Sequence, residues 1–82
     1  MIGKVIKVNH QKGFVVFEDD SGDYGWFEVL GSEEFEPGET IIGELHSLGS
    51  ETIIKQSTKE RVDVYIQDHG MSYMAAAEAM LR

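Results

Sequence analysis

Residues 12–29 read KGFVVFEDDSGDYGWFEV, and the two halves of this stretch decide how the remaining chain is interpreted. An apolar, β-branched run at 14–18 and an aromatic-rich run at 24–29 flank the turn at 19–23. Gly22 and the neighbouring Asp side chains suit a hairpin, because glycine adopts positive φ and Asx side chains bond the local backbone. The stretch therefore predicts two antiparallel strands.

The oxygen-rich turn is also a candidate for calcium. A calcium-binding loop needs glycine at its sixth position and a bidentate Glu at its twelfth. Counting from Asp19, those positions hold Tyr24 and Leu30. We therefore expect an ordinary turn, and the sequence predicts no metal site and no cofactor.

Three further short segments have strand character, at 5–8, 40–45 and 52–55, and Gly-, Pro-, Asn- or Ser-containing segments separate them. Short strands at a spacing of roughly ten residues are typical of an all-β barrel or sandwich. We therefore predict a mainly β fold, a small five-stranded barrel over residues 1–56.

The pattern changes from residue 57. Residues 57–60 have the Ser-x-x-Glu form of a capping box, which predicts a helix start. Gly70 stands where a left-handed helix C-terminal cap belongs. A competing interpretation places Val62, Val64 and Ile66 on the inward side of a sixth strand, but the cap and the glycine favour the helix. The residues at helical offsets on one face are Val62, Tyr65, Ile66 and His69.

A second helix is predicted after Ser72, a good N-cap, because residues 73–81 are rich in Ala and Met. Residues 57–82 would then form a helical hairpin packed on the barrel as one folding unit. A DNA-reading helix-turn-helix is disfavoured, because the second helix offers only Arg82 against Glu78 for contacting phosphate.

The length and the charge of the chain limit the functions that it can have. The 82 residues suffice for one small domain, the chain has no cysteine, and its formal net charge is −8. Residues 1–17 carry three Lys and no acid, whereas 18–51 carry eleven acids and no Lys or Arg. The net charge opposes nucleic acid and acidic membrane at long range. No membrane span or signal peptide is readable, so we expect a cytoplasmic protein.

A family resemblance rests on five groups of residues. They are Gly3-Lys4-Val5, Asn9, the run 12–17, the acidic turn, and Trp26-Phe27-Glu28-Val29. Together they resemble the cold-shock domain, a five-stranded OB barrel, over residues 3 to about 30. The resemblance implies an OB-like fold that binds single-stranded RNA or DNA by stacking bases on outward aromatic side chains, with lysines on phosphate.

Departures from the family pattern weaken this implication. Lys12, Gly13 and Phe14 agree with the first motif, and Trp26 stands at a stacking position of the second. Four positions depart, because Lys7 and Val16 replace stacking aromatics, Glu28 replaces a His and Val29 replaces a Phe. Losing several stacking positions, at ~1–3 kcal/mol per base, would lower the affinity by orders of magnitude.

Strand alternation makes an independent prediction about the same residues. If Val15, Phe17 and Phe27 point inward, then Phe14, Tyr24 and Trp26 share one outward face. Exposed aromatic groups of this size serve binding or lie under another element. The C-terminal hairpin is a candidate cover, and the sequence leaves open whether it lies there.

Two functions remain. The first is weak single-stranded nucleic-acid binding through Lys4, Lys7, Lys12, Phe14, Tyr24 and Trp26. The second is an acidic protein-interaction or regulatory module whose nucleic-acid face is lost or covered, with Phe35, Tyr73, Met74 and Met80 as contact candidates. Catalysis, a small-molecule substrate and membrane binding are not expected, because no catalytic motif occurs and His10, His46 and His69 are dispersed.

Overall fold

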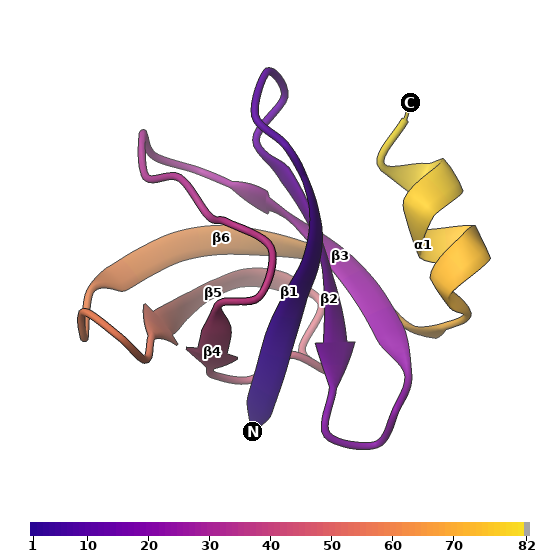
Figure 1. Ribbon diagram of the computed structural model, residues 1–82, viewed down its shortest axis with the longest axis horizontal. Coiled ribbons are helices and arrows are strands. Elements are labelled where there is room, and N and C mark those ends of the chain that lie inside the picture. Colours follow the sequence, from indigo (N-terminus) through magenta and orange to yellow (C-terminus); the bar gives the residue numbers. More distant parts are fainter. Residues whose placement is uncertain (82) are drawn as a thin grey trace.

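The computed structural model describes residues 1–81, and Arg82 lies outside the described residues. The described residues form six strands and one helix (Figure 1). In chain order these are β1 (Ile2–Asn9), β2 (Phe14–Asp19), β3 (Tyr24–Val29), β4 (Thr40–Ile42), β5 (Gly49–Lys55), β6 (Arg61–Met71) and α1 (Tyr73–Ala79).

The six strands close into one antiparallel barrel in the order β1-β2-β3-β6-β5-β4. The three-residue strand β4 completes the circle, since it pairs with both β1 and β5. At the other side β6 joins β3 to β5, and α1 follows it on the outside of the barrel (Figure 1). Among the described residues, no helix is long and apolar enough to cross a membrane.

Alternating side chains fill the barrel. Phe17 and Phe27 stack at a centroid separation of 5.9 Å, and Phe35 meets Phe27 edge to face at 5.5 Å. The inward direction predicted for Val15, Phe17 and Phe27 is confirmed, because all three belong to the buried core. The remaining buried core residues are Val5, Ile41, Leu45, Ile53, Val62, Val64 and Ile66.

The prediction of five strands followed by a helical hairpin is wrong for residues 61–71, which form β6. The alternating residues Val62, Val64 and Ile66 are each 0% exposed, as the competing strand interpretation required. Residues 61–71 form a strand because of the tertiary structure around them. Without β6, strands β3 and β5 would leave unpaired edges, whereas a β-branched strand between them bonds both edges and completes the core.

The residues whose pattern predicts helix caps belong to other local structures. Residues 56–58 form a turn in which the Thr58 hydroxyl accepts from the Glu60 backbone N–H at 3.3 Å, and Lys59 adopts φ 62°. Gly70 has the expected positive φ, 67°, but lies near the end of a strand. The prediction for Ser72 is confirmed, since its side chain caps α1 by accepting from the Ala75 N–H at 3.2 Å.

At Gly25, strand β3 lies close to the backbone of β6. The pairing register between these strands shifts on both sides of Trp26. A Cβ at Gly25 would lie 2.5 Å from the Asp68 carbonyl oxygen and 2.9 Å from the His69 Cα. Backbone atoms cannot move aside as a flexible side chain can, so this position requires glycine.

We therefore predict that Gly25→Ala destabilises the protein by about 1–3 kcal/mol, as overpacking does in a well-packed core. Gly31→Ala is the matched control, because there the new Cβ meets only the end of the flexible Glu33 side chain. Urea denaturation measures both variants. Equal stability of the two would contradict the close approach of β3 to β6.

Candidate functional site

The outer face of strands β1, β2 and β3 carries the aromatic residues that the sequence analysis selected. Phe14 lies opposite Glu28 in the β2–β3 pair, and Val16 lies opposite Trp26. Because Val15 and Phe27 point into the barrel, Phe14 and Trp26 point out. The prediction that the aromatic residues share one outward face is confirmed.

Helix α1 packs on this face. Ala76 and Met80 form a buried cluster with Val16, the side chain at the centre of the face. The half-buried residues packed around that cluster are Ile6, Phe14, Tyr24, Trp26 and Met71. The C-terminal element therefore covers the aromatic face, although as one short helix and not as a hairpin.

Aromatic contacts hold the covered residues to one another. Phe14 meets Trp26 edge to face at a centroid separation of 5.1 Å, and Tyr24 meets Tyr73 of α1 at 5.6 Å, also edge to face. Such pairs add about 0.5–1.5 kcal/mol beyond their area burial. Stacking of several bases on these rings would require α1 to move away.

The three lysines of the nucleic-acid hypothesis lie along one border of the face. Lys4 is opposite Glu18 and Lys7 is opposite Val16 in the β1–β2 pair, and both are exposed. The Lys12 Nζ lies 6.0 Å from the centroid of the Phe14 ring. On the other side, Glu28 is opposite both Phe14 and Tyr65.

The protein-contact candidates divide into two exposed and two buried residues. Tyr73 is 39% exposed and Met74 is 71% exposed, whereas Phe35 and Met80 are 1% exposed. Phe35 and Met80 therefore serve the packing of the chain and are out of a partner's reach. The sequence analysis did not select Leu81, which is 67% exposed and lies seven residues from Met74.

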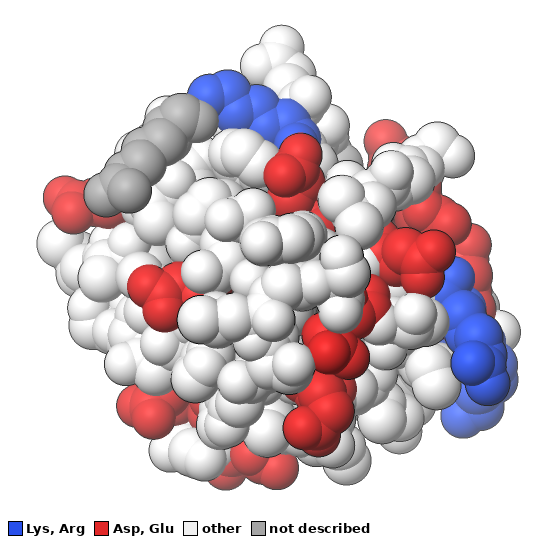
Figure 2. Space-filling model, turned by 180° about the vertical axis from the view of Figure 1, so that it is seen from behind, with Lys and Arg blue, Asp and Glu red and all other residues white. Residues whose placement is uncertain are grey.

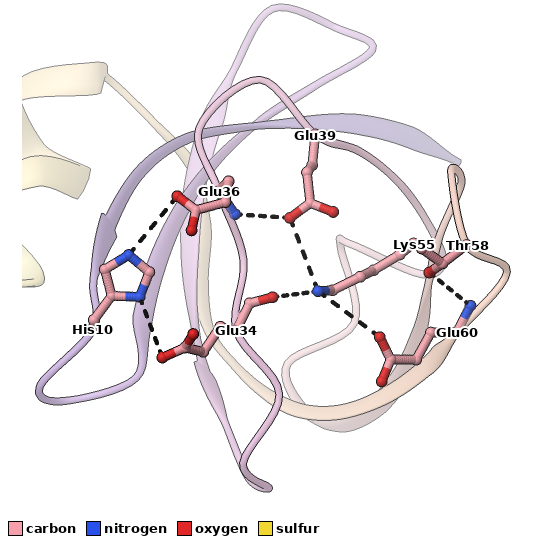
Figure 3. A network of polar contacts seen from close by, with 7 residues as sticks. All are labelled: His10, Glu34, Glu36, Glu39, Lys55, Thr58 and Glu60. Carbon is pink, nitrogen blue, oxygen red and sulfur yellow. Dashed lines mark hydrogen bonds and ion pairs between the residues drawn. The ribbon is translucent and has the colours of Figure 1, made fainter.

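The acidic loop around Phe35 is held to one end of the barrel by Lys55 (Figure 3). The Lys55 ammonium donates to the Glu34 carbonyl and lies 3.9 Å from carboxylate oxygens of both Glu39 and Glu60. It also lies 4.7 Å from the centroid of the Phe35 ring. The buried Lys55 thus holds the loop against the end of the barrel. The loop therefore has a structural role.

A second polar cluster joins Asp19, His46 and His69. The Asp19 side chain is fully buried, and its Oδ2 lies 2.6 Å from the His46 Nε2. The Asp19 Oδ1 accepts from the backbone N–H groups of Ser21 at 2.9 Å and Asp23 at 3.0 Å. The His46 ring stacks on the ring of His69 of β6 at 4.8 Å.

The pKa of Asp19 lies below its ordinary value of 3.8. Burial opposes ionisation and raises the pKa, but the hydrogen bonds from His46, Asp23 and Ser21 together outweigh it. An ionised carboxylate accepts only, so the His46 Nε2 carries the hydrogen and donates it. The residue that the sequence suggested as a hairpin turn position is therefore also a tertiary anchor.

We predict that Asp19→Asn loses about 1.5–3 kcal/mol at neutral pH, the contribution expected of hydrogen bonds to a charged group. A lowered folded-state pKa stabilises the fold above the unfolded value near 3.8, and this contribution is lost as the pH falls through the folded-state pKa. The stability gap between the wild type and Asp19→Asn should therefore narrow below pH 3.8.

Denaturant titrations at neutral and acidic pH measure that gap. Asp20→Asn, which changes the exposed neighbour in the same turn, serves as the matched control and should stay close to the wild type at both pH values. A gap that is independent of pH would show that the ionised form of Asp19 contributes nothing.

The surface charge is mostly acidic. Seen from behind in Figure 2, acidic side chains form separate patches over a largely uncharged face, and basic side chains occur in few places. Among residues 1–81, no group of three or more His, Asp or Glu side chains is placed to hold a metal ion. The structure therefore offers a covered aromatic face, an exposed side of α1 and a mainly acidic exterior.

These features define a class of fold: a small, closed, antiparallel six-stranded barrel with a short C-terminal helix, consistent with an OB-like fold. Comparisons with models of known families, with curated proteins and with solved structures found no match for this chain.

Proposed function

We propose that this protein is a relative of the cold-shock domain that works as a protein-interaction module for a basic polypeptide, its former base-stacking face being occupied by α1. The observation that carries the proposal is the packing of Ala76 and Met80 on Val16, Phe14 and Trp26. The part of the face that the chain's own helix fills is not free to stack bases.

The exposed side of α1 supports a protein partner. Met74 of α1 and Leu81, which lies in the turn just after α1, are strongly exposed, and Tyr73 adds a partly exposed ring. Exposed aromatic residues and methionines are enriched at protein interfaces. Because the net charge of the chain is −8, a basic partner gains electrostatic attraction on approach.

The test is a pair of titrations of the full chain at low salt, with a short arginine–glycine peptide and with single-stranded oligothymidylate. We expect calorimetry to detect binding of the peptide, and we expect this binding to weaken as salt is added. We expect the oligonucleotide to leave the fluorescence of Trp26 unchanged. Quenching by the oligonucleotide without peptide binding would reject the proposal.

A second candidate function, single-stranded nucleic-acid binding after α1 moves away, is favoured by the lysines beside the aromatic face. Lys4 and Lys7 are exposed on β1, and Lys12 lies beside the Phe14 ring. Seven residues of helix are too short to be stable in isolation. Fully burying a methionine such as Met80 contributes about 1.5–3 kcal/mol, a cost that stacking of one or two bases offsets.

We predict that Ala76→Gln, which places a larger polar side chain beneath α1, shifts the Trp26 emission to longer wavelength because the ring gains solvent. If the second candidate is right, oligothymidylate then quenches this variant and salt reverses the quenching. Ala77→Gln, on the same helix but outside the buried cluster, is the control and should behave as the wild type. If the emission of the Ala76→Gln variant is red-shifted but the oligonucleotide does not quench it, nucleic-acid binding is excluded.

A further inference from the structure

A groove runs between α1 and the barrel, beside the covered aromatic face. It has a volume of about 360 Å³, and Trp26 of β3 forms part of its lining. Met71, Ala75 and Ala79 supply apolar surface, whereas Asp68 of β6 and Glu78 of α1 supply carboxylates. No Lys or Arg of the described chain lines this groove.

The position of the two carboxylates follows from the fold. Asp68 is the residue of β6 directly opposite Trp26, at the place where the β3–β6 register shifts. Glu78 comes from the last turn of α1, so the two acids approach Trp26 from separate elements. The groove therefore combines an aromatic ring, two carboxylates and the Gln67 amide in a lining that is more polar than apolar.

Both carboxylates retain capacity for a ligand. The Asp68 Oδ1 accepts from the backbone N–H of His69 at 2.8 Å, which leaves the Oδ2 without a bond from residues 1–81. Glu78 has no side-chain hydrogen bond or ion pair with any other residue that the structure describes. Both residues are exposed, so a ligand reaches them without displacing the core.

We propose that this groove binds an arginine side chain of a basic polypeptide, with the guanidinium on the Trp26 ring and its N–H groups directed to Asp68 and Glu78. This inference rests on the proposed function and specifies where the partner is held. A guanidinium is planar, weakly hydrated and rich in donors, so it suits an aromatic ring flanked by carboxylates better than a compact ammonium does. Small-ligand sites usually have volumes of ~300–1,000 Å³, and the groove lies at the lower end of that range.

The same charges disfavour a nucleotide in the groove. A base stacked on Trp26 would bring its phosphate towards Asp68 and Glu78, and like charges at close range repel. Charge complementarity therefore selects the cationic side chain over the nucleic acid at this end of the aromatic face.

The test uses the full chain, the arginine–glycine peptide and an otherwise identical peptide in which citrulline replaces arginine. Trp26 is the only tryptophan, so its emission reports on the groove directly. We expect the arginine peptide to change the Trp26 emission saturably and the citrulline peptide to leave it unchanged. Asp68→Asn and Glu78→Gln should each weaken binding by ~2- to 5-fold, as loss of one exposed ion pair does.

Glu44→Gln is the control for general charge, because Glu44 is exposed in the segment between β4 and β5 and does not line the groove. If calorimetry shows peptide binding that Asp68→Asn, Glu78→Gln and Glu44→Gln weaken equally, the groove proposal is overturned and the proposed function stands. If the wild type binds neither peptide, the proposed function fails and the groove proposal fails with it. Using one variant on β6 and one on α1 keeps the result interpretable if either substitution loosens its element.

Discussion

The structure depends on the insertion of β6 between β3 and β5. This strand completes the hydrogen bonding of both neighbours, and its three inward residues, Val62, Val64 and Ile66, close the core. The position of α1 outside the barrel follows from where β6 ends. The chain leaves β6 at Met71, beside Tyr24 of β3, so the next residues emerge over the aromatic face. Ser72 then starts a helix whose Ala76 and Met80 side chains reach Val16.

The aromatic residues of this face would be exposed in one chain and are packed under a helix in another. In a barrel that ended after its closing strand, Phe14 and Trp26 would be exposed beside a line of lysines. In this chain Ala76 and Met80 bury part of that face, and the rings pack on one another and on α1. The accessible side chains therefore lie at the margins of the face, where Trp26 borders two carboxylates and where Met74 and Leu81 face solvent.

The first half of the fold could be read from the sequence, since its signals are local. The turn of residues 19–23 and the alternation on either side of it placed β3 at its observed bounds and gave the correct inward and outward faces. The last third could not be read in the same way. Ser57 and Glu60 carry a helix-start pattern and Gly70 a helix-stop pattern, and both are overridden by the requirement to pair the open edges of β3 and β5. Phe35 lies among glutamates, yet Lys55 draws its loop over the barrel end and buries the ring. The groove depends on Asp68 facing Trp26, a pairing between residues remote in sequence that no local pattern contains.

The order of the elements, with α1 after β6, also affects how the protein folds during synthesis. Synthesis proceeds from the N-terminus, and domains fold as their residues become available. Strands β1 to β3 are complete at residue 29, but the barrel needs β6 to residue 71 and the aromatic face needs Met80. Phe14, Tyr24 and Trp26 are therefore synthesised well before α1, the helix that covers them. A chain without the residues that follow Met71 would keep all six strands of the barrel but would lack the helix that covers Phe14, Tyr24 and Trp26.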